Sequence, residues 1–393
     1  MGCTSSSKSK TNGKLTAEEG ADLLDTYMRL DRDIFREERS PPAPALGHAM
    51  VKLDRLTTQL DLAMMDASLD HDEHHIAVPG TVPEIDTTRL ENYDDSIRRV
   101  LHELSLNRMP DQAMEHEEFI STLNRKAMKQ HRIFWLNRRK QDAQDEVTRL
   151  SERVQHLQNL YQHHDTLTNS VGSPKSELRG EADRLRSYRD TLYSGELSWK
   201  EAGRLVQAAA TLGRSGVDSW SELQDTLNTD SRWTLAQAAR NCIHEALLCI
   251  NAGQAVLPGV QFPYCSQREI QTVHQVLEYL YTDMQIPERY KHAANVYSSF
   301  QKRTSALYQW INKMVEETIH KDLVDVDQKL AEITRNMTNQ TVNNIRQMAG
   351  LGGVKDDESL TARMRDLDRK LLTNSVINNT IVFRHDPLRP ILH

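Results

Sequence analysis

Residues 133–161 form the stretch IFWLNRRKQDAQDEVTRLSERVQHLQNLY, which lies inside a longer run, 112–168, without proline or glycine. Its apolar residues recur at alternating steps of three and four, with one interruption at Lys140. They are Ile133, Leu136, Ala143, Val147, Leu150, Val154, Leu157 and Tyr161. This spacing places one apolar stripe along a helix and is typical of a coiled-coil seam. The stretch therefore predicts a long helix whose stripe is covered by another helix.

The segment after this helix supplies a partner. The polar loop at 168–174 contains glycine and proline and is expected to reverse the chain. Beyond it, three leucines seven residues apart, Leu178, Leu185 and Leu192, form a second stripe. The two stripes together predict an antiparallel helical hairpin.

Shorter helices are expected next. The pairs Ser198 with Glu201 and Ser219 with Glu222 have capping-box spacing and predict two helix starts, with Gly213 ending the first helix. An apolar helix is expected over 231–252, and the pair Ser266 with Glu269 predicts another start.

The run 288–349 again lacks proline and glycine and predicts a second long helical stretch. Its apolar residues change to steps of four near 314–323. Such a change locally unwinds a supercoil, so we expect a bend or a change of partner there.

The two ends of the chain are expected to be simpler. A short helix is predicted over 15–39, an extended proline-rich spacer over 40–44, and a second helix over 48–70. The segment 351–393 is expected to contain a glycine hinge, a last helix over 359–372 and a strand-like run at 376–383. That run is expected to dock on the bundle, or to add to a strand of a partner.

Composition supports an all-α fold. The 393 residues include only 16 glycines and 12 prolines, whereas average usage of the two together is roughly 12%. The sequence predicts an elongated helical bundle with coiled-coil segments behind a disordered acylated N-terminus. Its expected divisions are a lipid-anchor arm (1–14), short helices and proline-rich linkers (15–110), the bundle body (111–350), and a C-terminal helix and tail (351–393).

Charge and cysteine usage restrict the function classes. The net charge is −7, with 27% charged residues, which argues against general nucleic-acid binding. The four cysteines show no Cys-x-x-Cys spacing, as expected for thiols in a reducing compartment. The sequence also shows no secretory signal and no membrane-spanning stretch.

The first ten residues, MGCTSSSKSK, have the pattern of a lipid anchor. Removal of Met1 makes Gly2 the terminal amine, and Ser6 completes the pattern for N-myristoylation. Cys3 is the expected site of a second, palmitoyl chain, and Lys8, Lys10 and Lys14 add a weak attraction to anionic lipid. The decapeptide resembles the doubly acylated N-termini of Src-type kinases and of some G-protein α subunits. The resemblance implies only the anchor, because no kinase or GTPase motif follows.

A basic segment is the second candidate site. Between Phe119 and Gln141 there is no acidic residue, and seven basic residues occur: Arg125, Lys126, Lys129, Arg132, Arg138, Arg139 and Lys140. Trp135 lies on the apolar half of the same predicted helix, whereas Ile133 and Leu136 fall on the basic side. Three interpretations remain open. The basic side chains are solvated on a bundle helix, contact anionic lipid, or bind an acidic partner such as a calmodulin-like protein.

No catalytic motif is present, including Gly-x-Ser-x-Gly, His-Glu-x-x-His and Walker patterns. The run His71–His75 contains five potential metal ligands, but consecutive ligands in a loop rarely converge on one ion, and we expect a solvated turn. No metal site and no cofactor are predicted.

The sequence thus favours a dually acylated peripheral membrane protein that acts as a helical scaffold, tether or adaptor on the cytoplasmic face of a membrane, most simply the plasma membrane. Its expected partners are the membrane, through the lipids, and a protein or a second copy, through the coiled-coil seams. The alternatives are a membrane-curvature module built from a dimer of long helices, and a bundle enzyme or lipid-handling protein.

Overall fold

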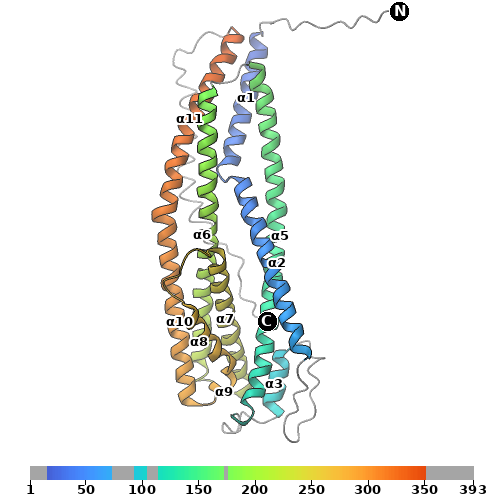
Figure 1. The fold of residues 1–393 in the computed structure, drawn as a ribbon, viewed down its shortest axis with the longest axis vertical. Coiled ribbons are helices and arrows are strands. Elements are labelled where there is room, and N and C mark those ends of the chain that lie inside the picture. Colours follow the sequence, from blue (N-terminus) through green and yellow to red (C-terminus); the bar gives the residue numbers. More distant parts are fainter. Residues whose placement is uncertain (1–15, 73–92, 104–113, 172–175, 351–393) are drawn as a thin grey trace, which may run out of the picture. The chain divides into compact units, whose positions relative to one another are not determined.

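The computed structural model describes residues 16–72, 93–103, 114–171 and 176–350. Helices and their short connections make up these ranges, and none of the described residues lies in a strand (Figure 1). The prediction of an all-α helical bundle is therefore confirmed. Coiled-coil geometry remains a prediction.

The helices fall into two compact units, each considered by itself. Unit 1 contains helix α1 (Ala17–Glu38) and parts of three longer helices, α5 (Glu117–Val171), α6 (Ser176–Glu222) and α11 (His320–Met348). Its small apolar core consists of Tyr27, Val171, Val342 and Ile345.

Helix α1 holds unit 1 together through polar contacts to each of the other three helices. Glu37 pairs with Arg153 of α5 at 2.8 Å, and Glu38 pairs with Arg186 of α6 at 3.3 Å. Thr338 of α11 donates a hydrogen bond to the Asp31 carboxylate at 3.2 Å. The short α1 therefore contacts all three helices through polar side chains, in addition to the apolar contacts of Tyr27.

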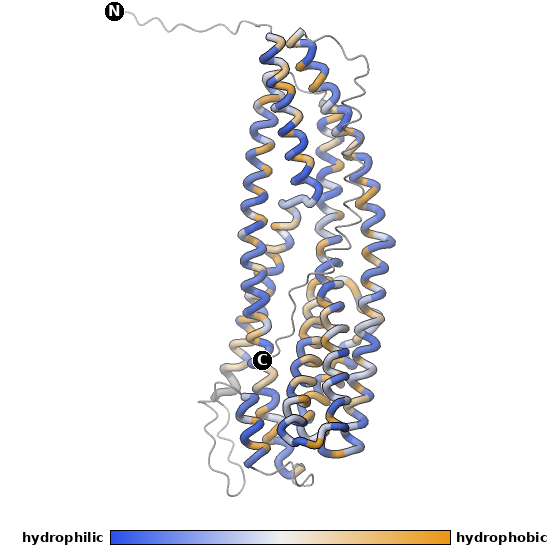
Figure 2. Tube along the Cα trace, turned by 180° about the vertical axis from the view of Figure 1, so that it is seen from behind, coloured by the Kyte–Doolittle hydropathy of each residue, from blue (hydrophilic) through white to orange (hydrophobic). Residues whose placement is uncertain are grey.

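Unit 2 contains most of α2 (Pro42–Asp72), α3 (Tyr93–Glu103), the first part of α5, the later part of α6, α7 (Thr229–Val256), α8 (Gln267–Glu278), α9 (Leu280–Asp283), α10 (Pro287–Met314) and η2 (Val315–Ile319). Its core is much larger than that of unit 1, and Figure 2 shows the many hydrophobic positions along these helices. Trp220 stacks on Tyr290 with ring centroids 5.1 Å apart, and Tyr297 meets the same indole edge-on.

Several expectations about particular helices are confirmed. All eight residues of the stripe in 133–161 are buried or half-buried. The apolar helix expected over 231–252 is α7, and α8 begins directly after Ser266, whose amide donates to Glu269 at 2.9 Å. The change of pattern near 314–323 coincides with η2, a π-helical turn, and the chain passes from unit 2 to unit 1 shortly after it, at Leu323.

Two expectations about helix boundaries are wrong. The proline-rich stretch is not an extended spacer, because α2 begins at Pro42 and takes both Pro42 and Pro44 into its first turn. Ser198 and Ser219 do not begin short helices, because α6 continues through them and through Gly213 to Glu222. In the middle of α6, the Ser198 hydroxyl donates to the carbonyl of Ser194 at 3.1 Å. Helix packing decides here, since Glu201 and Gly213 are both buried.

Some predicted features lie outside the described residues. They are the lipid-anchor arm, residues 73–75 of the histidine-rich run, and the hinge, helix and strand-like run of 351–393.

Candidate functional site

The structure describes one of the two candidate sites. Gly2, Cys3, Lys8, Lys10 and Lys14 lie outside the described residues. The basic segment lies on the first part of α5, in unit 2, so the surroundings of each of its side chains can be compared with the three interpretations.

Two of the basic residues form ion pairs on the surface of unit 2. Arg125 pairs with Glu118 at 2.8 Å and with Glu278 of α8 at 3.5 Å. Lys129 pairs with Asp66 of α2 at 3.3 Å. These charges link α5 to α8 and α2, although exposed pairs of this kind each contribute only about 0.2–1 kcal/mol.

Arg139 is half-buried and faces the interior of unit 2. It lies 3.5 Å from the carboxylate of Glu201, and its guanidinium stacks over the Trp135 ring at 4.7 Å. The same buried carboxylate lies 3.2 Å from His48 and 3.7 Å from Arg55. We call these four residues, Glu201, His48, Arg55 and Arg139, the Glu201 cluster. The cluster joins α2, α5 and α6.

Burial dominates the electrostatics of the Glu201 cluster. It lowers the pKa of Arg139, although the nearby charge of Glu201 opposes the effect. It also lowers the pKa of His48, again against the attraction of Glu201. One carboxylate thus faces two permanently charged guanidinium groups and an imidazole that burial favours in its neutral form.

The other four basic residues do not share one face. Arg132 and Arg138 are exposed, and Lys126 and Lys140 are half-buried. At about 100° per residue, Arg132 and Arg138 lie roughly 120° apart around the helix. Burial raises the pKa of Glu245, and the positive charge of Arg138 opposes that shift, so Arg138 also acts within unit 2.

Sequence reasoning missed the Glu201 cluster, because it interpreted Glu201 as a capping residue. It also missed a second buried network around Arg240. The Arg240 guanidinium contacts Asp94 at 2.6 Å, the Asn124 side-chain oxygen at 3.1 Å and the Tyr281 hydroxyl at 3.4 Å. The signal for it was the place of Arg240 among the apolar positions Ala236, Ala239 and Ile243 of α7, because an arginine on the buried side of a helix must find partners.

A histidine pair is buried in the same unit. The Nδ1 atoms of His131 and His244 lie 3.4 Å apart. Burial lowers the pKa of His131 to about 4 and that of His244 well below its ordinary value. Both imidazoles are therefore neutral near pH 7, and one donates a hydrogen bond to the other.

The chemistry of these groups is that of interior packing: charges that face opposite charges, and two neutral imidazoles in contact with each other. Within the described ranges, no three His, Cys, Asp or Glu side chains gather where they would hold a metal ion. None of the described helices is long and apolar enough to cross a membrane.

No family model, curated protein or solved structure matches the chain.

Proposed function

We propose that this chain is a peripheral membrane protein that two lipid chains, on Gly2 and Cys3, hold on the cytoplasmic face of a membrane. The proposal rests on one observation, the sequence Met1-Gly2-Cys3 with Ser6 in register for myristoylation. The plasma membrane is the proposed location.

The need for two chains follows from the energetics of insertion. A single myristoyl chain gives marginal, reversible binding with an association constant of roughly 10⁴ M⁻¹. A palmitoyl thioester on the adjacent Cys3 makes the attachment stable. Lys8, Lys10 and Lys14 each add about 1 kcal/mol at most beside an anionic leaflet.

We propose that the helical body acts as a scaffold, tether or adaptor rather than as a curvature module. A curvature module needs a continuous basic face. In the basic segment, Arg125 and Lys129 are ion-paired, and Arg139 is half-buried and paired with Glu201, which supports the scaffold. Trp135 is buried, and neither Trp135 nor Arg139 is included in the proposed contact surface.

Four basic residues remain for contact with an acidic group: Lys126, Arg132, Arg138 and Lys140. They are a minor addition to the proposed anchor, because they do not share one helix face.

Cell fractionation tests the anchor. The chain, tagged at its C-terminus and expressed in eukaryotic cells, is expected in the membrane fraction. Gly2→Ala should make it soluble, because myristoylation requires the terminal glycine amine. Cys3→Ser should leave weak binding that exchanges between membranes, because one chain remains.

The matched control is Ser5→Ala, which alters the arm but leaves Gly2, Cys3 and Ser6 in place; it should behave as the unaltered chain. Mass spectrometry of the N-terminal peptide should show both acyl groups. An unmodified or acetylated terminus would contradict the proposal.

A further inference from the structure

Helix α3 is held in unit 2 along one of its faces (Figure 1). Its buried residues are each at most 2% exposed: Ser96, Ile97, Val100 and Leu101. At about 100° per residue they fall within an arc of roughly 140°. The three apolar residues among them belong to the same core as residues of α2, α5 and α7. The opposite face is exposed and polar, so α3 is an amphipathic helix seated on the body of unit 2.

One carboxylate of α3 reaches the buried network around Arg240. Asp94 accepts a hydrogen bond from the Arg240 guanidinium at 2.6 Å. On the helix, Asp94 lies about 20° beyond Leu101, at the edge of the buried face. The Arg240 side chain is 1% exposed, whereas that of Asp94 is 23% exposed. The carboxylate is therefore the end of this network that solvent reaches.

Arg240 depends on that carboxylate for its counter-charge. Within the described ranges, its other hydrogen-bond partners are neutral side-chain oxygens, those of Asn124, Asn241 and Tyr281. A buried charge that loses its only counter-charge is strongly destabilising. We call the surface that receives α3 the α3 site, and its polar residues are Arg240, Asn124, Asn241 and Tyr281. Any occupant of the α3 site must bring a carboxylate to Arg240.

The length of α3 makes its stability depend on the α3 site. It has 11 residues, fewer than the roughly 12–15 that an isolated helix needs to persist in water. Helix formation and seating are therefore one local step, which can reverse without unfolding the rest of unit 2. An apolar surface that receives one face of a short amphipathic helix is a recurring mode of recognition between proteins.

We propose that the α3 site binds a helix of a partner protein and that α3 is its intramolecular competitor. The partner helix carries the pattern that α3 shows, Asp-x-x-Ile-x-x-Val-Leu, with the carboxylate on Arg240 and the apolar residues in the core. A helix without the carboxylate is rejected, because it leaves Arg240 unpaired. A second copy of this chain is a poorer occupant, because its own α3 is held within its own molecule at a high effective concentration. The proposal goes beyond lipid anchoring and does not depend on it.

Amide hydrogen exchange tests whether the α3 site opens. The Gly2→Ala chain is used, because it carries no acyl group and the result is then independent of the proposed anchor. The amides of α3 should exchange through local opening, at least about tenfold faster than the buried amides of α7, although more slowly than in a free peptide of residues 93–103. Helix α7 is the reference, because it carries Arg240 and stays folded when α3 leaves.

Peptide binding tests recognition. Ile97→Ser with Val100→Ser in the Gly2→Ala chain weakens its own α3 and opens the site. A fluorescent peptide of residues 93–103 should bind this opened chain at least about tenfold more tightly than the Gly2→Ala chain with intact α3. The reason is that a site open for only a fraction of the time has its apparent affinity reduced by that fraction. Fluorescence anisotropy measures the binding.

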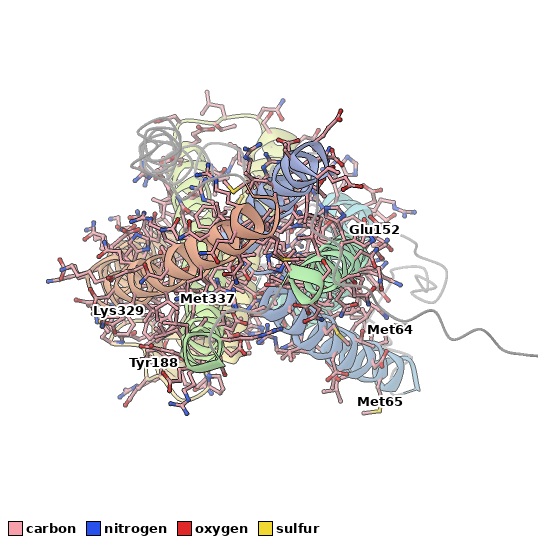
Figure 3. The ribbon with its side chains drawn as sticks, turned by 90° about the horizontal axis from the view of Figure 1, so that it is seen from above. Met64, Met65, Glu152, Tyr188, Lys329 and Met337 are labelled. Carbon is pink, nitrogen blue, oxygen red and sulfur yellow. The ribbon has the colours of Figure 1, made fainter. Side chains whose placement is uncertain are left out.

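A milder variant covers the case in which the opened chain loses helix content. Asp94→Asn in the Gly2→Ala chain keeps the apolar face of α3 and should also increase peptide binding. Its control is Glu152→Gln, which removes one charge from an exposed carboxylate on α5 in unit 1 (Figure 3). That chain should bind the peptide no more tightly than the Gly2→Ala chain.

The charge of the peptide tests the role of Arg240 without changing the protein. Asp94→Asn in the peptide should weaken binding to the opened chain at least about tenfold, because Arg240 then has no counter-charge. Asp95→Asn removes the same charge from the exposed face of α3 and should leave binding within about twofold.

Three outcomes overturn the proposal. They are α3 amides that exchange no faster than those of α7, a peptide that binds neither of the two chains with a weakened α3, and equal binding of the Asp94→Asn and Asp95→Asn peptides.

Discussion

At the scale of single residues, the Glu201 carboxylate is a buried charge of unit 2 that lies close to side chains of two other helices. It faces Arg139 at 3.5 Å, Arg55 at 3.7 Å and His48 at 3.2 Å. Glu201→Gln keeps the shape of the side chain but removes the negative charge that faces the Arg139 and Arg55 guanidinium groups. The loss should be about 3 kcal/mol of unfolding free energy, measured by urea denaturation followed by circular dichroism.

Glu222→Gln is the matched control for Glu201, because Glu222 is an exposed glutamate on the same helix. It should change stability by less than about 0.5 kcal/mol. Equal effects of the two substitutions would mean that the Glu201 cluster contributes nothing.

The close approach of α6 to α7 explains why position 216 is a glycine. A Cβ atom there would lie 2.6 Å from the side chain of the buried Ile243. Alanine favours helix over glycine by about 1 kcal/mol, but overpacking costs about 1–3 kcal/mol. Gly216→Ala should therefore destabilise the protein by roughly 1 kcal/mol in thermal or urea unfolding.

Gly195→Ala provides the comparison, since nothing lies within 4 Å of its added Cβ. That substitution should stabilise α6 by about 0.5–1 kcal/mol. Stabilisation by both substitutions would contradict the packing argument.

Unit 1 has a pH-dependent group in Asp31. Burial raises its pKa from 3.8 to about 6; Glu38 acts in the same direction, and Thr338 and Arg186 oppose it. The folded state therefore binds the proton of the Asp31 carboxyl more tightly than the unfolded state does. The contribution of Asp31 to the free energy of unfolding falls as pH rises from about 4 to about 6. At about 1.4 kcal/mol per pKa unit, the change is at most about 3 kcal/mol.

Asp31→Asn cannot ionise, so its stability relative to the unaltered chain should increase over that pH range. Melting temperatures at pH 4 and pH 7 measure the change. Asp25→Asn, an exposed position on α1, should run parallel to the unaltered chain. If the melting temperature of Asp31→Asn changed with pH as much as that of the unaltered chain, Asp31 would not be the source of the pH dependence.

At the scale of helices, α6 tests whether capping patterns in the sequence act as caps. Ser198 lies within the helix, where its hydroxyl donates to Ser194 and no amide needs a cap. Ser198→Ala should change stability by less than about 0.5 kcal/mol, with a gain from helix propensity. The Asn228 side chain accepts a hydrogen bond from the Ser231 amide at 3.1 Å, at the start of α7. Asn228→Ala should therefore lower the free energy of unfolding by about 1 kcal/mol. Urea unfolding of both variants makes the comparison, and a similar loss in the two would restore the short-helix interpretation.

The contrast between α5 and α6 shows where sequence reasoning ends at this scale. The stripe of α5 was predictable because apolar periodicity reports burial directly. The continuity of α6 could not be predicted from the sequence in the same way. A Ser-x-x-Glu pattern is also compatible with an unbroken helix, and only the course of α6 in the structure, where the Ser198 hydroxyl donates to Ser194, distinguishes the two.

At the scale of the whole molecule, net charge sets the expected behaviour near membranes. The chain carries −7, and three of its seven clustered basic residues face acids of unit 2. Gly2→Ala protein should therefore bind anionic vesicles weakly at physiological salt, where the Debye length is about 8 Å. Vesicle sedimentation provides the measurement.

Arg132→Glu with Arg138→Glu should leave that weak binding within about twofold, because the two side chains lie far apart around α5. Lys8→Glu with Lys10→Glu is the comparison. This double substitution should abolish the weak binding of the Gly2→Ala protein to anionic vesicles. Strong binding that disappears with the α5 changes would instead support a membrane-apposed basic segment.

The sequence by itself determined the all-α class, the long helices on either side of residue 172, and the irregularity at η2. Each follows from local periodicity or from the absence of proline and glycine, which need no knowledge of neighbours. Only the tertiary structure decided that Pro42 begins α2, that α6 is unbroken, and that Arg139 and Trp135 face the interior. The physical reason is that a charged or capping residue has several satisfactory local environments. The partners that helices α2, α5 and α6 bring together select among them.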